Sequence, residues 1–180
     1  LLKLNLWKGV GKVAQNAVKH HPKKAFFLNI FARHLLSVGE KHKALNYYEK
    51  CIELNRKSYN SWLALGNCYY VCRNLNKAVY CLEQSKKISH FMTDSAFLLE
   101  SNILQAHSRY DDAMEKLKAG IKMFPLSKPL TSSLAMTNLK IGNKEEGFKL
   151  YNLIDNSNRT NFMNLVNYKL KSKSKNLQNE

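Results

Sequence analysis

Four cysteines are the residues whose type and spacing could do chemistry in this chain. Cys68 and Cys72 are four residues apart, with Cys51 before them and Cys81 after them. Thiolates bind soft metals such as zinc, which takes four ligands in a structural site. No fourth ligand stands at motif spacing to Cys68, Cys72 and Cys81, so we expect no metal and reduced, packed thiols. The even count permits disulfides, but a chain of 180 residues with 44% hydrophobic residues does not need them.

The chain contains no arrangement typical of a catalytic site. Its six histidines fall outside zinc-binding spacings, and nucleophile-elbow, phosphate-loop and dinucleotide-binding motifs are missing from the sequence. The acid pairs Asp111-Asp112 and Glu145-Glu146 stand where helices are expected to begin, and carboxylates there complement the positive end of the helix dipole. We therefore expect a protein that is not an enzyme and that uses no cofactor.

The net charge narrows the class of partner. The formal charge is +16, from 29 Lys and Arg against 13 Asp and Glu, which favours acidic partners. A lysine-rich surface that meets only water would give the same charge. Residues 1–24 hold six lysines and no acid, yet no tract is basic enough to indicate nucleic-acid binding by itself. We expect a protein or peptide partner, preferably acidic, rather than nucleic acid. No stretch reaches the ~18 apolar residues of a membrane span.

The sequence repeats with a period of 34 or 35 residues. Any surface that binds a partner must be built from these repeats. Small residues recur in two columns, and the apolar spacing within each period predicts two helices. Glycine inside a helix costs about 1 kcal/mol relative to alanine, so its presence at Gly66 indicates close helix packing. The columns are Ala32, Gly66, Ser101 and Ala135, and Ala44, Ala78, Ala113 and Gly147.

The repeating unit resembles the tetratricopeptide repeat, whose pattern begins W-x2-L-G-x2-Y and continues with a small residue. The stretch "SYNSWLALGNCYYVCRNLNKAVYCLEQSKKI" carries this pattern, and "HKALNYYEKCIELN" and "RYDDAMEKLKAGIKMFP" carry its second half. The resemblance implies an all-α fold, a solenoid of antiparallel helix pairs wound as a right-handed superhelix.

The resemblance also predicts the domain organisation. Four tetratricopeptide-like repeats fill residues 25–161, after a basic N-terminal helix at 1–24 that resembles the second half of an incomplete repeat. Residues 162–180 are expected to form a capping helix and a frayed basic tail. The repeats are predicted at 25–58, 59–93, 94–127 and 128–161.

In this family the first helices of the repeats line a concave groove that binds a peptide or a helix. Asn67 and Asn102 could hydrogen-bond the main chain of an extended peptide, and Arg33 could hold a carboxylate with two hydrogen bonds. The family's carboxylate clamp also uses lysines one turn earlier, at positions that are not lysine here. The predicted groove residues are Asn29, Arg33, Leu63, Asn67, Tyr70, Leu98, Asn102, Gln105 and Met136.

These features predict a non-catalytic scaffold for protein–protein interaction, located in the cytoplasm. One alternative is the repeat domain of a larger bacterial-type membrane glycosyltransferase or envelope assembly protein, which would be periplasmic or lumenal and have a membrane-embedded remainder. The stretch "NLWKGVGKVAQNAVKHHPKKAF" is similar to the entry into the repeats of such glycosyltransferases, and the chain does not begin with methionine. A second alternative is an RNA-binding helical repeat, which the charge favours but the predicted groove, poor in Lys and Arg, does not.

Overall fold

The computed structural model describes residues 2–154, and every regular element in this range is an α-helix. The absence of strands from the described range confirms the predicted all-α class. The capping helix and tail expected at 162–180 lie outside the described residues. In chain order the helices are α1 Leu2–His20, α2 Ala25–Ser37, α3 Lys41–Leu54, α4 Tyr59–Val71, α5 Leu75–Ile88, α6 Asp94–Ala106, α7 Tyr110–Met123, α8 Lys128–Ile141 and α9 Lys144–Asn152.

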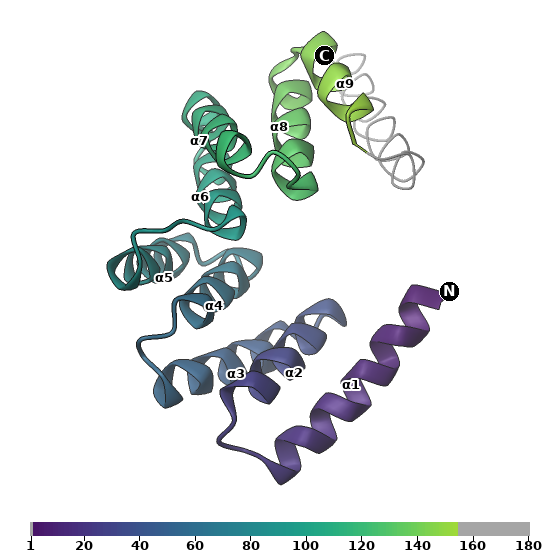
Figure 1. Ribbon diagram of the computed structural model, residues 1–180, viewed down its shortest axis with the longest axis vertical. Helices are drawn as coiled ribbons and strands as arrows, with labels where there is room; N and C mark the ends of the chain where they lie inside the picture. Colours follow the sequence, from purple (N-terminus) through teal and green to yellow (C-terminus); the bar gives the residue numbers. More distant parts are fainter. Residues whose placement is uncertain (1, 155–180) are drawn as a thin grey trace, which may run out of the picture. The chain divides into compact units, whose positions relative to one another are not determined.

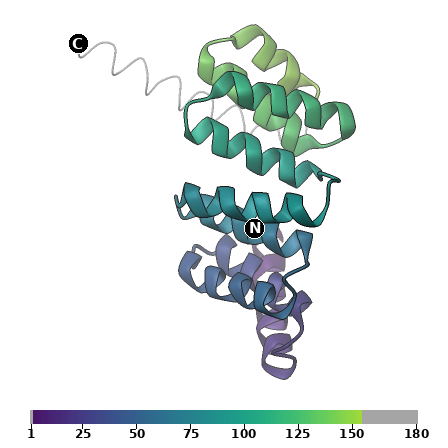
Figure 2. The ribbon, with the colours of Figure 1, turned by 90° about the vertical axis from the view of Figure 1, so that its left-hand side faces the viewer.

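The chain divides into two compact units, Leu1–Lys116 and Leu117–Glu180. In the first unit, α2 packs on α3 and α4 packs on α5, and in the second unit α8 packs on α9. Within the first unit α2, α4 and α6 follow one another along one side, which we call the first-helix face, and α3 and α5 lie along the other side, the second-helix face (Figure 1; Figure 2 views this second side). This series of packed helix pairs confirms the predicted repeat solenoid.

The turns that follow α2, α4, α6 and α8 have the same backbone conformation. One residue takes a left-handed φ between 60° and 93°, and these residues are Gly39, Arg73, Ser108 and Gly142. The residue that follows donates its N–H to the carbonyl five residues back, at 2.9 to 3.0 Å, as in a Schellman helix end. Gly39 and Gly142 adopt the conformation at little cost, whereas Arg73 and Ser108 do so against the clash of their Cβ atoms.

Close packing around Gly66 explains why α4 tolerates a glycine. A Cβ atom at Gly66 would lie 2.9 Å from Cδ2 of Leu99 on α6 and 3.2 Å from Cβ of Cys81 on α5. The residues before and after it in the column, Ala32 and Ser101, are fully buried. Small side chains therefore allow α4, α5 and α6 to approach one another, as the column of small residues predicted.

Helix α1 packs against α2 at a second close approach. Gly11 is buried, and a Cβ atom there would overlap the imidazole of His34. The His34 ring is stacked on Phe31, with 6.4 Å between ring centroids. The contact packs α1 closely on α2.

Candidate functional site

Eight of the nine predicted groove residues lie on the three helices of the first-helix face. Asn29 and Arg33 are on α2, and Met136, the ninth residue, is on α8 in the second unit. Helix α4 contacts both α2 and α6. The predicted groove residues on these three helices therefore lie on neighbouring helices. The remaining members are Leu63, Asn67 and Tyr70 on α4, and Leu98, Asn102 and Gln105 on α6.

Asn67 and Asn102 occupy equivalent positions on adjacent helices. Each follows a buried small residue, Gly66 or Ser101, and each is itself half-buried. Within the described residues the structure shows no hydrogen-bond partner for either side-chain amide. Each amide therefore keeps two donor hydrogens and one acceptor oxygen available to a ligand.

Leu63 is the one predicted groove residue that is buried. Its side chain is only 4% exposed and belongs to the hydrophobic core of the first unit. Helix α4 is packed by α2, α3, α5 and α6, so more of its circumference is covered than the repeat register suggests.

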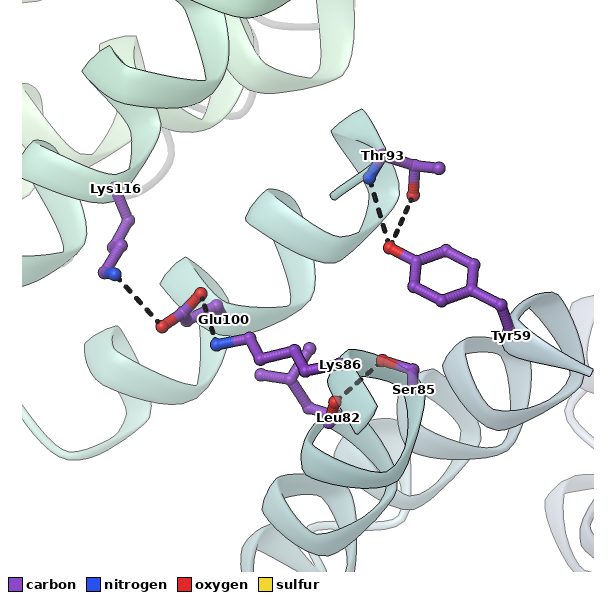
Figure 3. Close-up of polar contacts among 7 residues, drawn as sticks. All are labelled: Tyr59, Leu82, Ser85, Lys86, Thr93, Glu100 and Lys116. Atoms are coloured by element: carbon purple, nitrogen blue, oxygen red, sulfur yellow. Dashed lines mark hydrogen bonds and ion pairs between the residues drawn. The ribbon is translucent and has the colours of Figure 1, made fainter. Parts of the chain in front are cut away.

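One ion pair and one hydrogen bond attach α6, and with it Asn102, to the preceding helices, and a second ion pair attaches α6 to α7 (Figure 3). Glu100 stands in the column that holds the apolar residues Phe31 and Leu65 in the preceding repeats. Its Oε2 lies 3.0 Å from Nζ of Lys86 on α5, and its Oε1 lies 3.4 Å from Nζ of Lys116 on α7. The two cations neutralise a carboxylate whose side chain is only 16% exposed.

The start of α6 is attached to the start of α4. The backbone N–H of Thr93, the residue before α6, donates to the hydroxyl oxygen of Tyr59 at 3.1 Å (Figure 3). Tyr59 is the first residue of α4. The bond therefore joins equivalent ends of two successive first helices and holds the Asn67 and Asn102 positions in register.

The cysteines are free thiols, and three of them are buried. Burial raises the pKa of Cys51 to about 11 and that of Cys68 and Cys81 to about 12. These thiols stay protonated at neutral pH, and a protonated thiol is neither a nucleophile nor a metal ligand. Within residues 2–154 no group of three or more His, Cys, Asp and Glu residues is arranged to hold a metal ion.

A cleft on the second-helix face was missed by the sequence analysis. It has a volume of about 380 Å³ and shares no residue with the predicted groove. Trp62 and Tyr80 form part of its wall, with ring centroids 6.0 Å apart and an edge-to-face geometry. Trp62 is the first residue of the W-x2-L-G-x2-Y pattern, and that pattern within one helix gives no sign of the contact with Tyr80. The lining residues are Glu49, Ile52, Glu53, Trp62, Leu65, Tyr69, Lys77, Tyr80 and Cys81.

Among the helices that the structure describes, none combines the length and the apolar character needed to cross a bilayer.

Comparison with known proteins places the fold. No protein-family model matches the chain. The BBSome complex member BBS4 of Bos taurus is 24% identical over 128 residues, which are 71% of this chain and 24% of that protein. The chain thus spans about a quarter of the length of this curated relative.

Two solved structures show the same architecture. A thermophilic TPR protein of Thermus thermophilus has a TM-score of 0.73 at 19% identity, over 84% of this chain and 82% of that chain. YrrB, described as a TPR protein with an unusual peptide-binding site, has a TM-score of 0.57 at 19% identity, over 78% of this chain and 72% of that chain. Likeness at this level of identity shows the fold, and the resemblance predicted from the sequence is confirmed at that level.

Proposed function

We propose that this chain, which has the tetratricopeptide-repeat fold, is a non-catalytic scaffold that binds an extended segment of a partner protein along the first-helix face. The observation that carries the proposal is the pair of side-chain amides at Asn67 and Asn102. They are half-buried, equivalent in register, and without partners among the described residues.

The chemistry of the pair suits a peptide main chain. An extended segment presents N–H and C=O groups at regular intervals, and each amide side chain can donate to one and accept from the other. Because α4 and α6 are in contact, two such amides can hold one segment that runs across both helices. The exposed Arg33 on α2 extends this surface with a cation, which favours an acidic segment.

The buried thiols bear on the compartment. Cys51, Cys68 and Cys81 are protonated, unpaired and packed in the core. Free thiols of this kind suit a reducing environment, where disulfides are rare. We therefore place the protein in the cytoplasm as part of the proposal.

A peptide-binding experiment tests the proposal. Peptides selected from a random library on the wild-type chain would be measured by fluorescence anisotropy against Asn67→Ala/Asn102→Ala. Loss of two hydrogen bonds, at about 1 kcal/mol each, should weaken binding at least about tenfold. The matched control is Asn46→Ala/Asn76→Ala, which removes two exposed asparagines from α3 and α5 and should leave affinity unchanged. Equal affinity of the two double variants would contradict the proposal.

The same variants separate the scaffold from the RNA-binding alternative. RNA bound through phosphates is released steeply as salt rises. RNA binding with that salt dependence, unaffected by Asn67→Ala/Asn102→Ala, would support the RNA alternative and count against the scaffold.

A further inference from the structure

The cleft on the second-helix face lies between α3, α4 and α5, within the first unit. Its floor is apolar and includes Ile52 and Leu65, and its wall includes the ring pair of Trp62 and Tyr80. Tyr80 is 54% exposed, so this aromatic wall is accessible from outside. We call this feature the aromatic cleft. It is formed by the side of α4 that does not carry Asn67.

Two carboxylates stand at the aromatic cleft. Glu49 and Glu53 are one turn apart on α3, and both are exposed. Oε1 of Glu49 accepts a hydrogen bond of 2.6 Å from the Tyr69 hydroxyl. Within the described residues no cation lies within ion-pair distance of either carboxylate. In a chain of net charge +16, an acidic pair left without a cation on an aromatic cavity is a local excess of negative charge.

One cation lines the same cleft without joining the acids. Nζ of Lys77 lies over the ring of Tyr69, 5.2 Å from its centroid. This cation–π contact holds the lysine beside the cleft. Lys77 thus reduces the negative potential there but leaves Glu53 open to an incoming group.

We propose that the aromatic cleft binds an arginine side chain of a partner protein. The aliphatic stem of arginine would lie on the apolar floor, and the planar guanidinium would stack on the face of one of the two nearly perpendicular rings, that of the exposed Tyr80. The guanidinium fork matches a carboxylate such as that of Glu53, to which it can donate two parallel hydrogen bonds. The cleft is a second binding site of opposite charge preference to the proposed peptide surface, and it does not depend on that surface.

Arginine is favoured over lysine by the composition of the wall. A guanidinium is planar and weakly hydrated, so it loses less on leaving water for an aromatic surface than a compact ammonium does. The volume of about 380 Å³ is at the lower end of small-ligand sites. It accommodates one long side chain rather than a folded element.

The test uses the full chain and a single probe, N-acetylarginine amide. Binding is followed in the 15N–1H NMR spectrum at the indole N–H of Trp62, which donates 2.8 Å to the carbonyl of Arg56 and is assigned with Trp62→Phe. A saturable shift is expected with a dissociation constant in the millimolar range, the scale for a ligand of this size. N-acetylcitrulline amide, which has the same shape but no charge, should give no saturable shift. Equal shifts with the arginine and citrulline probes would overturn the assignment. Equal shifts with the arginine probe and with the corresponding lysine amide would overturn it too.

Three variants give effects of different sign. Glu53→Gln should weaken binding of the arginine probe about fivefold, the upper range for one accessible ion pair. Lys77→Gln removes the competing cation and should tighten binding by a similar factor. Glu83→Gln, an exposed acid on α5 that does not line the cleft, is the matched control and should have no effect. Unchanged affinity in both Glu53→Gln and Lys77→Gln, with melting curves like the wild type, would refute the proposal.

The two proposals can fail separately. Asn67→Ala/Asn102→Ala should leave binding of the arginine probe unchanged, because neither asparagine lines the aromatic cleft. A loss of probe binding in this double variant would contradict the independence of the cleft from the first-helix face.

Discussion

At the scale of single residues, Gly66 shows how close packing outweighs helix propensity. Alanine would gain about 1 kcal/mol of propensity at this position. A Cβ would, however, meet Leu99 at 2.9 Å and Cys81 at 3.2 Å. The Leu99 contact is the end of a flexible side chain and can move, but the Cys81 contact is made by a Cβ close to the backbone. A larger side chain cannot be accommodated without separating α4 from α5 and α6.

We expect Gly66→Leu to lower the free energy of unfolding by about 3 kcal/mol, because overpacking a filled core costs roughly that much. Gly66→Ala should change stability by less than about 1 kcal/mol, since propensity offsets the contact. The control is Gly9→Ala in α1, where a Cβ atom would meet nothing within 4 Å. This variant should raise the free energy of unfolding, because alanine has the higher helix propensity. Urea unfolding measures all three. Wild-type stability in Gly66→Leu would show that the packing around this column has been misassigned.

At the scale of elements, the turns inside the helix pairs carry a cost in two places. Arg73 and Ser108 hold φ values of 63° and 60°, in the left-handed region that glycine occupies at Gly39 and Gly142. A residue with a Cβ loses roughly 1 kcal/mol there. The hydrogen bond after the turn, such as Asn74 N–H to Tyr69 C=O at 2.9 Å, maintains the conformation nonetheless.

We expect Arg73→Gly and Ser108→Gly each to raise the free energy of unfolding by up to about 1 kcal/mol, because glycine relieves the left-handed strain. Gly39→Ala, which makes the reverse exchange in the same turn of the first pair and meets no side chain, should lower it by a similar amount. Thermal melting followed by circular dichroism distinguishes these outcomes. A lower melting temperature for both glycine variants would mean that contacts of the Arg73 and Ser108 side chains exceed the strain.

The sequence predicts the helices but not the burial and the contacts that depend on several helices at once. The helix pairs could be predicted because the columns of small residues that contain Gly66 and Ala78 recur with the period. The burial of Leu63 could not be predicted because it depends on four neighbouring helices. The aromatic cleft was missed because it requires α3 and α5 to meet beside α4, a relation between residues far apart in sequence.

At the scale of the whole molecule, the response of stability to pH follows from its buried cysteine thiols and tyrosine hydroxyls. Burial raises the thiol pKa of Cys51, Cys68 and Cys81 above the ordinary value of 9.0. Burial also raises the pKa of Tyr48 and Tyr69 above 10.0, with Glu49 raising that of Tyr69 further. The unfolded chain releases these protons at lower pH than the folded chain. Stability is therefore complete below about pH 9 and falls as pH rises toward the folded-state pKa values.

We expect the melting temperature to stay constant up to about pH 9 and then to fall. Each buried thiol should lower the free energy of unfolding by about 1 kcal/mol at about pH 10. Cys81→Ala should show a shallower fall, measured relative to its own value at pH 7. Cys72→Ala is the comparison, because that thiol is half-buried. Thiol labelling at pH 7.5 should modify Cys72 in the folded chain and the other three only in denaturant. Identical pH profiles for Cys81→Ala and wild type would contradict the linkage.

Glu100 also makes one junction between repeats chemically different from the others. Repeat arrays present similar apolar columns at every junction, and such columns allow helix pairs to stack in the wrong order or with a second chain. At this junction the column carries a carboxylate, matched by Lys86 from the preceding pair and by Lys116 from α7. A different pair stacked here, without a lysine at the place of Lys86, would leave Glu100 buried with half of its charge compensation lost. The ion pairs that hold α6 in place thus also distinguish the correct neighbour from its near copies.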